Sequence, residues 1–296
     1  MARVLVTGAN GFIGKHLVHR LRSLDHEVIE VNRQTGDISS QEIWATFPPT
    51  DVVVHLAARA FVPDSWSDPI GFVHTNFHGT MCALDYCRIH KARMIFISAY
   101  LYGIPNALPI PESAALSPNN PYAFSKKIAE DACRFYSEYY GIDITVLRPF
   151  NIYGPGQSQK WLIPSIIEQV LKGKIIEVMD LTPKRDYVYI DDLNQAIIYS
   201  LDRLSGFNVF NIGSGQSYSV ENVIELIQYA EGSNIRVRCI GERRPQEIMD
   251  TIADISRARE ELGWSPRWSL LSGIKAIVEA KKNLPSYEKK KYSHFY

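Results

Sequence analysis

A glycine-rich turn close to the start of the chain constrains the fold more than any other feature. The segment 7–14, TGANGFIG, follows an apolar strand expected at 3–7 and precedes a helix expected at 12–24. In such a turn one glycine permits the tight bend, one lets the backbone approach a pyrophosphate, and one lets the helix pack closely on the strand. The spacing is GxxGxxG, and the first strand–helix turn is the place that the motif requires. The turn therefore predicts dinucleotide binding, with contacts from Gly8, Asn10, Gly11, Phe12, Ile13 and Gly14.

The first half of the chain alternates apolar strands with amphipathic helices. Strands are expected at 3–7, 27–31, 51–55, 92–97 and 142–147, and helices at 12–24, 39–47, 70–90 and 122–140. This alternation, with short connections, indicates an α/β fold with a doubly wound parallel sheet of the Rossmann type.

After Pro149 the expected elements become shorter. Helices are expected at 163–171, 191–203, 220–230, 256–262 and 270–281, and strands at 175–178, 187–190, 207–212 and 235–240. The chain then divides into a dinucleotide-binding domain, 1–150 plus roughly 186–212, and a smaller α/β substrate-binding cap. The cap comprises roughly 151–185 and 213–285, and 286–296 are expected to form an exposed tail.

Composition excludes several classes of partner. Lys plus Arg and Asp plus Glu both number 32 among 296 residues, so the formal net charge is zero. Because nucleic acid and anionic membranes select for basic excess, neither is expected as a partner. The apolar runs are far shorter than the roughly 18 residues of a membrane span, and no signal-peptide pattern is present. Four cysteines without a CxxC pair favour a reduced, cytoplasmic protein.

The residues after the second strand indicate whether the dinucleotide is NAD or NADP. An acidic residue there would hold the adenosine ribose of NAD, but this strand is followed by Asn32 and Arg33. The pair tolerates a 2′-phosphate, so NADP(H) is slightly favoured over NAD(H), and the alternative is an arginine merely exposed at a strand end. Asp37 is placed to accept a hydrogen bond from the adenine amino group.

A serine, a tyrosine and a lysine are expected to meet at the carboxyl edge of the sheet. Tyr122 and Lys126 share one face of the helix 122–140, and Ser98 ends the strand 92–97. A tyrosine is a poor base at its ordinary pKa of about 10, and a neighbouring ammonium should lower that pKa. Ser98 would hydrogen-bond the reacting oxygen. The set predicts carbonyl–alcohol redox catalysis; the alternative is a helix-start aromatic residue beside a surface charge.

Nine segments together resemble the extended short-chain dehydrogenases/reductases, namely the NAD-dependent epimerase/dehydratase family that acts on nucleotide sugars. They are TGANGFIG (7–14), GDI (36–38), VVHLAA (53–58), SAYLYG (98–103), PYAFSK (121–126), LRPFNIYGPG (147–156), KRDYVYIDDL (184–193), NIGSG (211–215) and RRPQE (243–247). The resemblance covers nearly the whole chain. It implies a homodimer through the helices 70–90 and 122–140.

The same resemblance assigns further site residues. It implies that Ala57 and Ala58 lie against the phosphate–ribose part of the cofactor, and that Lys126 binds the nicotinamide ribose. Further cofactor contacts are implied for Ile38, Leu56, Asn76 and Tyr122, and substrate contacts for Ser98, Tyr100, Asn151, Arg185 and Arg244. Planar guanidinium groups suit a diphosphate, which agrees with the two arginines. Arg185 has an alternative role in an ion pair with Asp186.

Two departures from the family pattern narrow the reaction. Dehydratases of the family carry acids directly after the catalytic serine or threonine, whereas Ala99 and Tyr100 follow Ser98 here. Dehydration is therefore disfavoured, and so is a decarboxylation that relies on an acid there. The pair Asn32–Arg33 and the short connection to Asp37 favour reduction of a 4-keto-6-deoxy sugar nucleotide. The alternative is a 4-epimerase that retains NAD+, and a remote alternative is a dinucleotide-binding protein without catalysis.

No metal site is expected. His74 and His78 have the i,i+4 spacing of a zinc-binding pair, but no third ligand accompanies them in the sequence. The pair is therefore interpreted as a feature of the helix surface.

Overall fold

Six parallel strands form the main sheet, in the order β2-β1-β3-β4-β5-β9. The structure is a computed structural model that describes residues 1–173, 175–201, 204–242 and 247–283. The strands are β1 (Arg3–Thr7), β2 (Glu27–Val31), β3 (Val52–His55), β4 (Arg93–Ile97), β5 (Ile144–Pro149) and β9 (Phe207–Ile212). The predicted fold class is confirmed, because the strand order reverses after β1 as in a doubly wound sheet.

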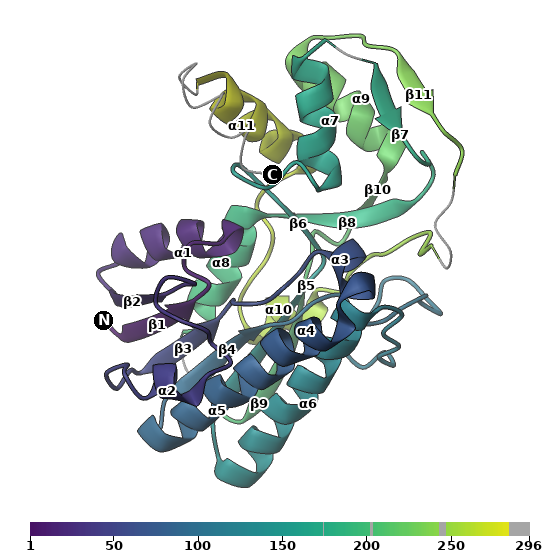
Figure 1. Cartoon of the computed structure of the whole chain (residues 1–296). Helices are drawn as coiled ribbons and strands as arrows, with labels where there is room; N and C mark the ends of the chain where they lie inside the picture. The colour runs from purple at the N-terminus through teal and green to yellow at the C-terminus, as the bar shows by residue number, and fades with distance from the viewer. Residues whose placement is uncertain (174, 202–203, 243–246, 284–296) are drawn as a thin grey trace.

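Helices cover both faces of this sheet (Figure 1). Successive residues of a strand point to opposite faces, and so Val4 and Val6 of β1 join one buried cluster while Leu5 joins the other. The first cluster includes residues of α1 (Phe12–Arg22), α8 (Ile190–Tyr199) and α10 (Ser256–Glu261). The second includes residues of α2 (Gln41–Trp44), α5 (Gly79–His90) and α6 (Pro121–Tyr140).

The cap begins where β5 ends and stands above the main sheet in the view of Figure 1. It contains a three-stranded sheet in the order β10-β8-β6 and a parallel pair of β7 with β11. Three helices enclose its own apolar core. Its elements are β6 (Asn151–Tyr153), α7 (Leu162–Leu171), β7 (Ile176–Val178), β8 (Lys184–Tyr189), β10 (Ser217–Ser219), α9 (Val220–Glu231), β11 (Val237–Cys239) and α11 (Leu270–Asn283).

The expectation of one uninterrupted α-helix at 70–90 is wrong in one respect. It consists of α4 (Pro69–Val73), one π-helical turn η1 (His74–His78) and then α5. A π turn holds one extra residue, which 3.6-residue periodicity does not reveal, and such turns are frequent at functional sites. The helix α3 (Val62–Ser67) and the strands β6 and β10 were not expected.

Other expected boundaries shift at the element ends. The helix expected at 39–47 shrinks to α2, and the strand expected at 187–190 begins earlier, as β8. The expected tail 286–296 lies outside the described residues. Among the helices that the structure describes, none is both long and apolar enough to cross a membrane.

Candidate active site

The glycine turn forms a cradle at the start of α1. Gly8 has a φ of +70°, which glycine tolerates best, and a Cβ there would lie 3.0 Å from the backbone nitrogen of Ala57. A Cβ at Gly14 would collide with the carbonyl oxygen of Gly8. The N-cap of α1 is Gly11, and no side chain caps the helix. The first N–H groups of α1 therefore remain available for a phosphate, so the cradle fits a dinucleotide.

The loop after β3 is tied to this cradle. Thr7 Oγ1 accepts hydrogen bonds of 3.1 Å from the backbone N–H groups of Leu56 and Ala57. The same hydroxyl lies 2.9 Å from Nδ1 of the buried His55. These bonds hold Ala57 beside Gly8, and the expected contacts of Ala57 and Ala58 with the phosphate–ribose part of the cofactor stay predictions.

The side-chain amide of Asn76, on the π turn, forms hydrogen bonds to Arg59 and Ser125. Its Oδ1 accepts from the backbone N–H of Arg59 at 2.8 Å, and its Nδ2 donates to the carbonyl oxygen of Arg59 at 3.0 Å. Nδ2 also donates to Ser125 Oγ at 2.9 Å. Asn76 is buried and so joins the loop after β3 to α6, the helix that carries Tyr122. These contacts tie the loop to α6, and the expected cofactor contact of Asn76 stays a prediction.

The predicted adenosine end is organised by two side-chain turns. Asn32 Oδ1 accepts from the backbone N–H of Gln34 at 2.8 Å, and Arg33 beside it is exposed. Asp37 Oδ1 accepts from the N–H and hydroxyl of Ser39 at 3.0 and 2.7 Å. These hydrogen bonds lower the pKa of Asp37, so it is an anion at neutral pH. Ile38, between Asp37 and Ser39 in the chain, is buried.

The residues that follow Ser98 pack on the start of α6, because Ala99 and Leu101 share a buried cluster with Ala123 and Tyr122 packs against it. Ser98 is 3% exposed, and its Oγ is enclosed without a hydrogen-bond partner among the described residues. Its backbone N–H donates to Leu147 O at 2.8 Å, which continues the pairing of β4 with β5. Asn120 caps α6 by accepting from the N–H of Ala123 at 2.8 Å and so fixes the first turn, where Tyr122 lies.

Burial controls the titration of the two catalytic candidates on α6. It raises the pKa of Tyr122 to about 12 and lowers the pKa of Lys126 to about 7. The expected lowering of the tyrosine pKa is thus wrong for the protein without ligands, because desolvation disfavours the charged form of each group. Lys126 Nζ lies 4.0 Å from the centroid of the Phe96 ring.

The expected substrate side is built by β8 and the segment that follows the undescribed residues 243–246. Arg185 pairs with Glu247 and donates to the carbonyl oxygens of Lys184 and Ile248. The alternative ion pair with Asp186 is wrong. The carboxylate of Asp186 instead accepts hydrogen bonds from Ser214, Gly215 and Ala253.

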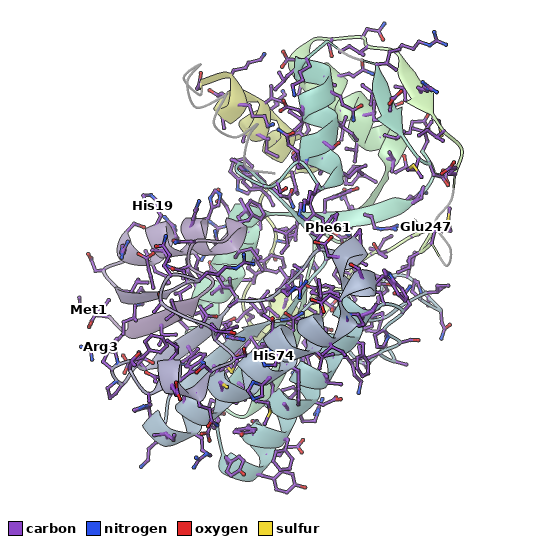
Figure 2. All side chains as sticks on the ribbon, viewed as in Figure 1. Met1, Arg3, His19, Phe61, His74 and Glu247 are labelled. Carbon is purple, nitrogen blue, oxygen red and sulfur yellow. The ribbon has the colours of Figure 1, made fainter. Side chains whose placement is uncertain are left out.

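The other expected substrate contacts lie around this strand. Asn151 Nδ2 donates to the carbonyl oxygen of Asp186 at 3.0 Å. Tyr100 donates its hydroxyl to Gly103 O at 2.7 Å, and its ring packs against Phe150. Arg244 lies outside the described residues. Figure 2 shows Glu247 and Phe61 where the sheet half and the cap meet.

Sequence reasoning missed Glu247, although it belongs to the quoted RRPQE segment. The only signal was a carboxylate three residues after Arg244 in a segment that already resembled a substrate site. The two histidines considered for zinc stack on each other with ring centroids 5.3 Å apart. Within the part of the chain that the structure describes, no group of three potential ligands could hold a metal ion.

Comparison with known proteins identifies relatives over nearly the full length. The family described as "NAD dependent epimerase/dehydratase family" matches residues 4–213. A putative UDP-glucose 4-epimerase from Methanocaldococcus jannaschii is 31% identical, over 95% of this chain and 98% of its own. GDP-6-deoxy-D-mannose reductase from Pseudomonas aeruginosa is 29% identical, over 93% and 96%. The crystal structure of UDP-glucose 4-epimerase from Thermotoga maritima with UDP-glucose superposes with a TM-score of 0.88 at 28% identity, over 95% and 98%.

Proposed function

The chain is an enzyme of the NAD-dependent epimerase/dehydratase family, and from this premise we propose that it is a nucleotide-sugar 4-epimerase with retained NAD+. The observation that carries the proposal is the enclosed, unpartnered hydroxyl of Ser98, which directly precedes Ala99 in the cluster that packs against Tyr122. A buried polar atom without a partner is costly, and a sugar oxygen at C4 would satisfy it.

The relatives support epimerisation better than the reduction that the sequence analysis favoured. Besides the Methanocaldococcus protein, four relatives at 28–29% identity are named UDP-glucose 4-epimerase. In an epimerase the same hydride leaves C4 and returns to it, so no cofactor is consumed. UDP-glucose and its C4 epimer are accordingly the first substrates to test.

In the proposed reaction each side chain has a separate task. A bound nicotinamide supplies reversible hydride transfer at C4. Ser98 hydrogen-bonds the C4 oxygen, and Tyr122 takes the hydroxyl proton and later returns it. A charged Lys126 stabilises the phenolate of Tyr122, and burial keeps water from that proton transfer. Because Ala99 and Tyr100 follow Ser98, the site offers no carboxylic acid there for eliminating a hydroxyl.

Arg185 and Asn151 are the proposed contacts of the diphosphate, together with Arg244. The guanidinium of Arg185 is planar and matches phosphate oxygens in a bidentate manner. Glu247 already pairs with this guanidinium, so the diphosphate would replace the carboxylate as the anion that Arg185 holds.

Reduction of a 4-keto-6-deoxy sugar nucleotide is the second candidate. Arg33 is exposed directly after Asn32 and can accept a 2′-phosphate, which favours NADPH. The Pseudomonas reductase supports this reading by its similarity over 93% of the chain.

Cofactor content separates the two candidates. We would denature the freshly purified protein, identify any released dinucleotide, and assay interconversion of UDP-glucose and UDP-galactose without added cofactor. Retained NAD+ with interconversion supports the epimerase. An empty site that prefers NADPH and turns over a 4-keto sugar nucleotide supports the reductase.

Replacing the catalytic tyrosine tests whether the site is catalytic. Tyr122→Phe should lower activity by about a hundredfold or more while dinucleotide binding survives. The matched control is Tyr136→Phe on the same helix, which should retain activity. Equal activity in both variants would contradict the assignment of Tyr122 and revive a non-catalytic, dinucleotide-binding role.

A homodimer through α5 and α6 is also proposed. Large apolar side chains on these helices are 49–72% exposed, namely Ile89, Phe124, Phe135, Tyr139 and Tyr140. An apolar face of this kind is typical of a protein–protein contact. Light scattering should give about twice the chain mass, and a value near 33.6 kDa would contradict the dimer.

A further inference from the structure

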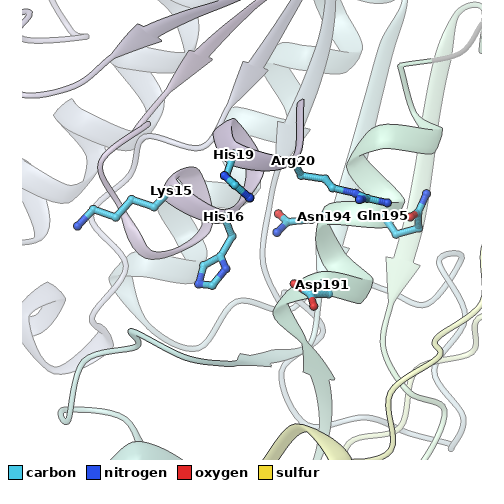
Figure 3. Close-up of a pocket in the computed structure, with 7 residues that line it drawn as sticks. All are labelled: Lys15, His16, His19, Arg20, Asp191, Asn194 and Gln195. Atoms are coloured by element: carbon cyan, nitrogen blue, oxygen red, sulfur yellow. The ribbon is translucent and has the colours of Figure 1, made fainter. Parts of the chain in front are cut away.

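A hollow of about 480 Å³ lies between α1 and α8. It is lined by Lys15, His16, His19, Arg20, Asp191, Asn194 and Gln195. We refer to it as the α1–α8 groove. None of its seven residues belongs to the set assigned to cofactor, substrate or catalysis. Figure 3 shows Asn194 pointing from α8 toward His19 of α1, while Arg20 reaches across toward Gln195.

The floor of the α1–α8 groove contains an unsatisfied amide. Asn194 is 3% exposed, and its Oδ1 is enclosed without a partner among the described residues. Asparagine is a weaker helix former than alanine or leucine, and its neighbours Leu193 and Ala196 are buried apolar residues. A buried amide in this place costs free energy unless another polar group reaches it.

The rim of the groove carries charges that the protein leaves unpaired. Lys15, Arg20 and Asp191 form no ion pair with any residue that the structure describes. His16 differs, because its Nε2 lies 2.9 Å from the carbonyl oxygen of Pro155, which fixes its ring. The groove thus combines two cations, one carboxylate and one buried amide.

We propose that the α1–α8 groove is a second binding site, for a phosphorylated sugar. Arg20 holds the phosphate through its planar guanidinium, with His19 beside it. The sugar hydroxyls reach the amide of Asn194 and the carboxylate of Asp191. A hydroxyl both donates and accepts, so it bonds either end of the amide once the Asn194 side chain turns into the groove. A phosphorylated sugar engages Arg20 together with Asp191 and Asn194, whereas phosphate alone or an uncharged sugar engages only part of this set.

The test is calorimetric titration of the full chain with glucose 1-phosphate, inorganic phosphate and glucose as separate probes. Glucose 1-phosphate should bind at least about tenfold more tightly than inorganic phosphate or glucose. Arg20→Gln and Asn194→Leu should each weaken that binding about tenfold or more. Arg20→Gln changes an exposed side chain, so it keeps the test informative if Asn194→Leu affects folding.

Two control variants locate the binding. Ser98→Ala in the active site and Arg22→Gln outside the groove should leave the affinity unchanged. The proposal is overturned if inorganic phosphate binds as tightly as glucose 1-phosphate, which would indicate an anion site only. It is also overturned if Ser98→Ala weakens binding while the groove variants do not. The readout is affinity for the groove and does not depend on epimerase activity, so the two proposals fail separately.

Discussion

The main sheet and the cap each carry an arginine–glutamate pair on one of their strands. In the sheet half, Arg148 of β5 pairs with Glu130 of α6 at 2.6 Å, and both side chains are at most 5% exposed. In the cap, Arg185 of β8 pairs with Glu247, with the two side chains 22% and 17% exposed. The same two residue types therefore meet in a dry setting and in a wetter one.

The sheet pair is locked by further contacts. Arg148 Nε donates to both carboxylate oxygens of Glu130, and Nη1 donates to the hydroxyl of Tyr102 at 3.0 Å. Burial alone lowers the pKa of Arg148, but its bonds to Glu130 raise it above the ordinary value. This buried ion pair fixes the position of α6 against β5. Glu130 lies one helical turn after Lys126, so the pair also fixes the part of α6 that carries Lys126.

The cap pair has fewer contacts to a carboxylate. Among the described residues Arg185 donates to one carboxylate, that of Glu247, and to the backbone carbonyl oxygens of Lys184 and Ile248. In the proposed function a diphosphate replaces Glu247 at the more exposed cap pair. If so, the buried pair stabilises the fold and the cap pair takes part in binding.

The largest effect is expected from breaking the sheet pair. Glu130→Ala leaves Arg148 buried without its carboxylate and should lower the free energy of unfolding by about 3–5 kcal/mol. Urea denaturation measures the change. The neighbouring Asp131→Ala is the matched control, since its ion pair with Lys127 is exposed and should cost less than about 1 kcal/mol. Equal losses would show that the buried pair does not stabilise the fold.

Removing the arginine of the cap pair should act on binding instead of folding. Arg185→Gln should weaken UDP binding about tenfold to a hundredfold, because a charge-assisted contact to the diphosphate is lost. The free energy of unfolding should change by less than about 1 kcal/mol. Calorimetry with UDP measures the affinity, and Arg238→Gln in β11 is the control because its pair with Glu177 is exposed. Unchanged UDP affinity would remove Arg185 from the proposed site.

Lys126 offers a third case, a buried cation that forms no ion pair with the described residues. Its pKa is lowered by burial from 10.5 to about 7, so the unfolded chain binds more protons than the folded one between these values. Stability should therefore rise with pH from about 7 to 8.5, by at most about 1.4 kcal/mol per pH unit. Above that range Cys133 and Tyr122, whose pKa values burial raises, act in the opposite direction.

Denaturation of the protein without ligands at pH 7.0, 7.5, 8.0 and 8.5 measures this slope. Lys126→Met removes the titrating group and should flatten it. Lys127→Met, one residue along, is the control, because Lys127 lies at the surface and pairs with Asp131. A rise that persists in Lys126→Met would assign the slope to another group.

The sequence was sufficient for the elements whose signal is local. The main strands follow from apolar runs, and their parallel pairing is confirmed. The meeting of Ser98 with Tyr122 at the carboxyl edge of the sheet stays a prediction. The π turn at His74–His78 was not predictable, since one inserted residue changes only the phase of a helix. The strands β6 and β10 were missed because each has three residues with polar positions, Asn151–Tyr153 and Ser217–Ser219, and lacks the longer apolar run that marked 175–178 and 235–240.

Three features of the structure were not predicted correctly, and each depends on contacts between residues that are distant in sequence. Glu247 lies 62 residues from Arg185, and nothing local in either segment pairs them. The pKa of Tyr122 was expected to fall because only Lys126 was visible in sequence, whereas desolvation by the whole fold dominates. Asn194 likewise looks like an ordinary helix residue until α1 packs beside it.

The smallest effects should come from the same Glu→Gln substitution at both pairs, which changes one charge and keeps the shape. Glu130→Gln should lower the free energy of unfolding by about 2 kcal/mol and leave UDP affinity unchanged. Glu247→Gln should change stability by less than about 1 kcal/mol and tighten UDP binding about two- to fivefold, because a competing anion leaves Arg185. Denaturation and UDP titration of both variants measure the four quantities. Weaker UDP binding by Glu247→Gln would mean that Glu247 contacts the nucleotide directly, and the cap pair would then be part of the binding surface instead of a competitor for it.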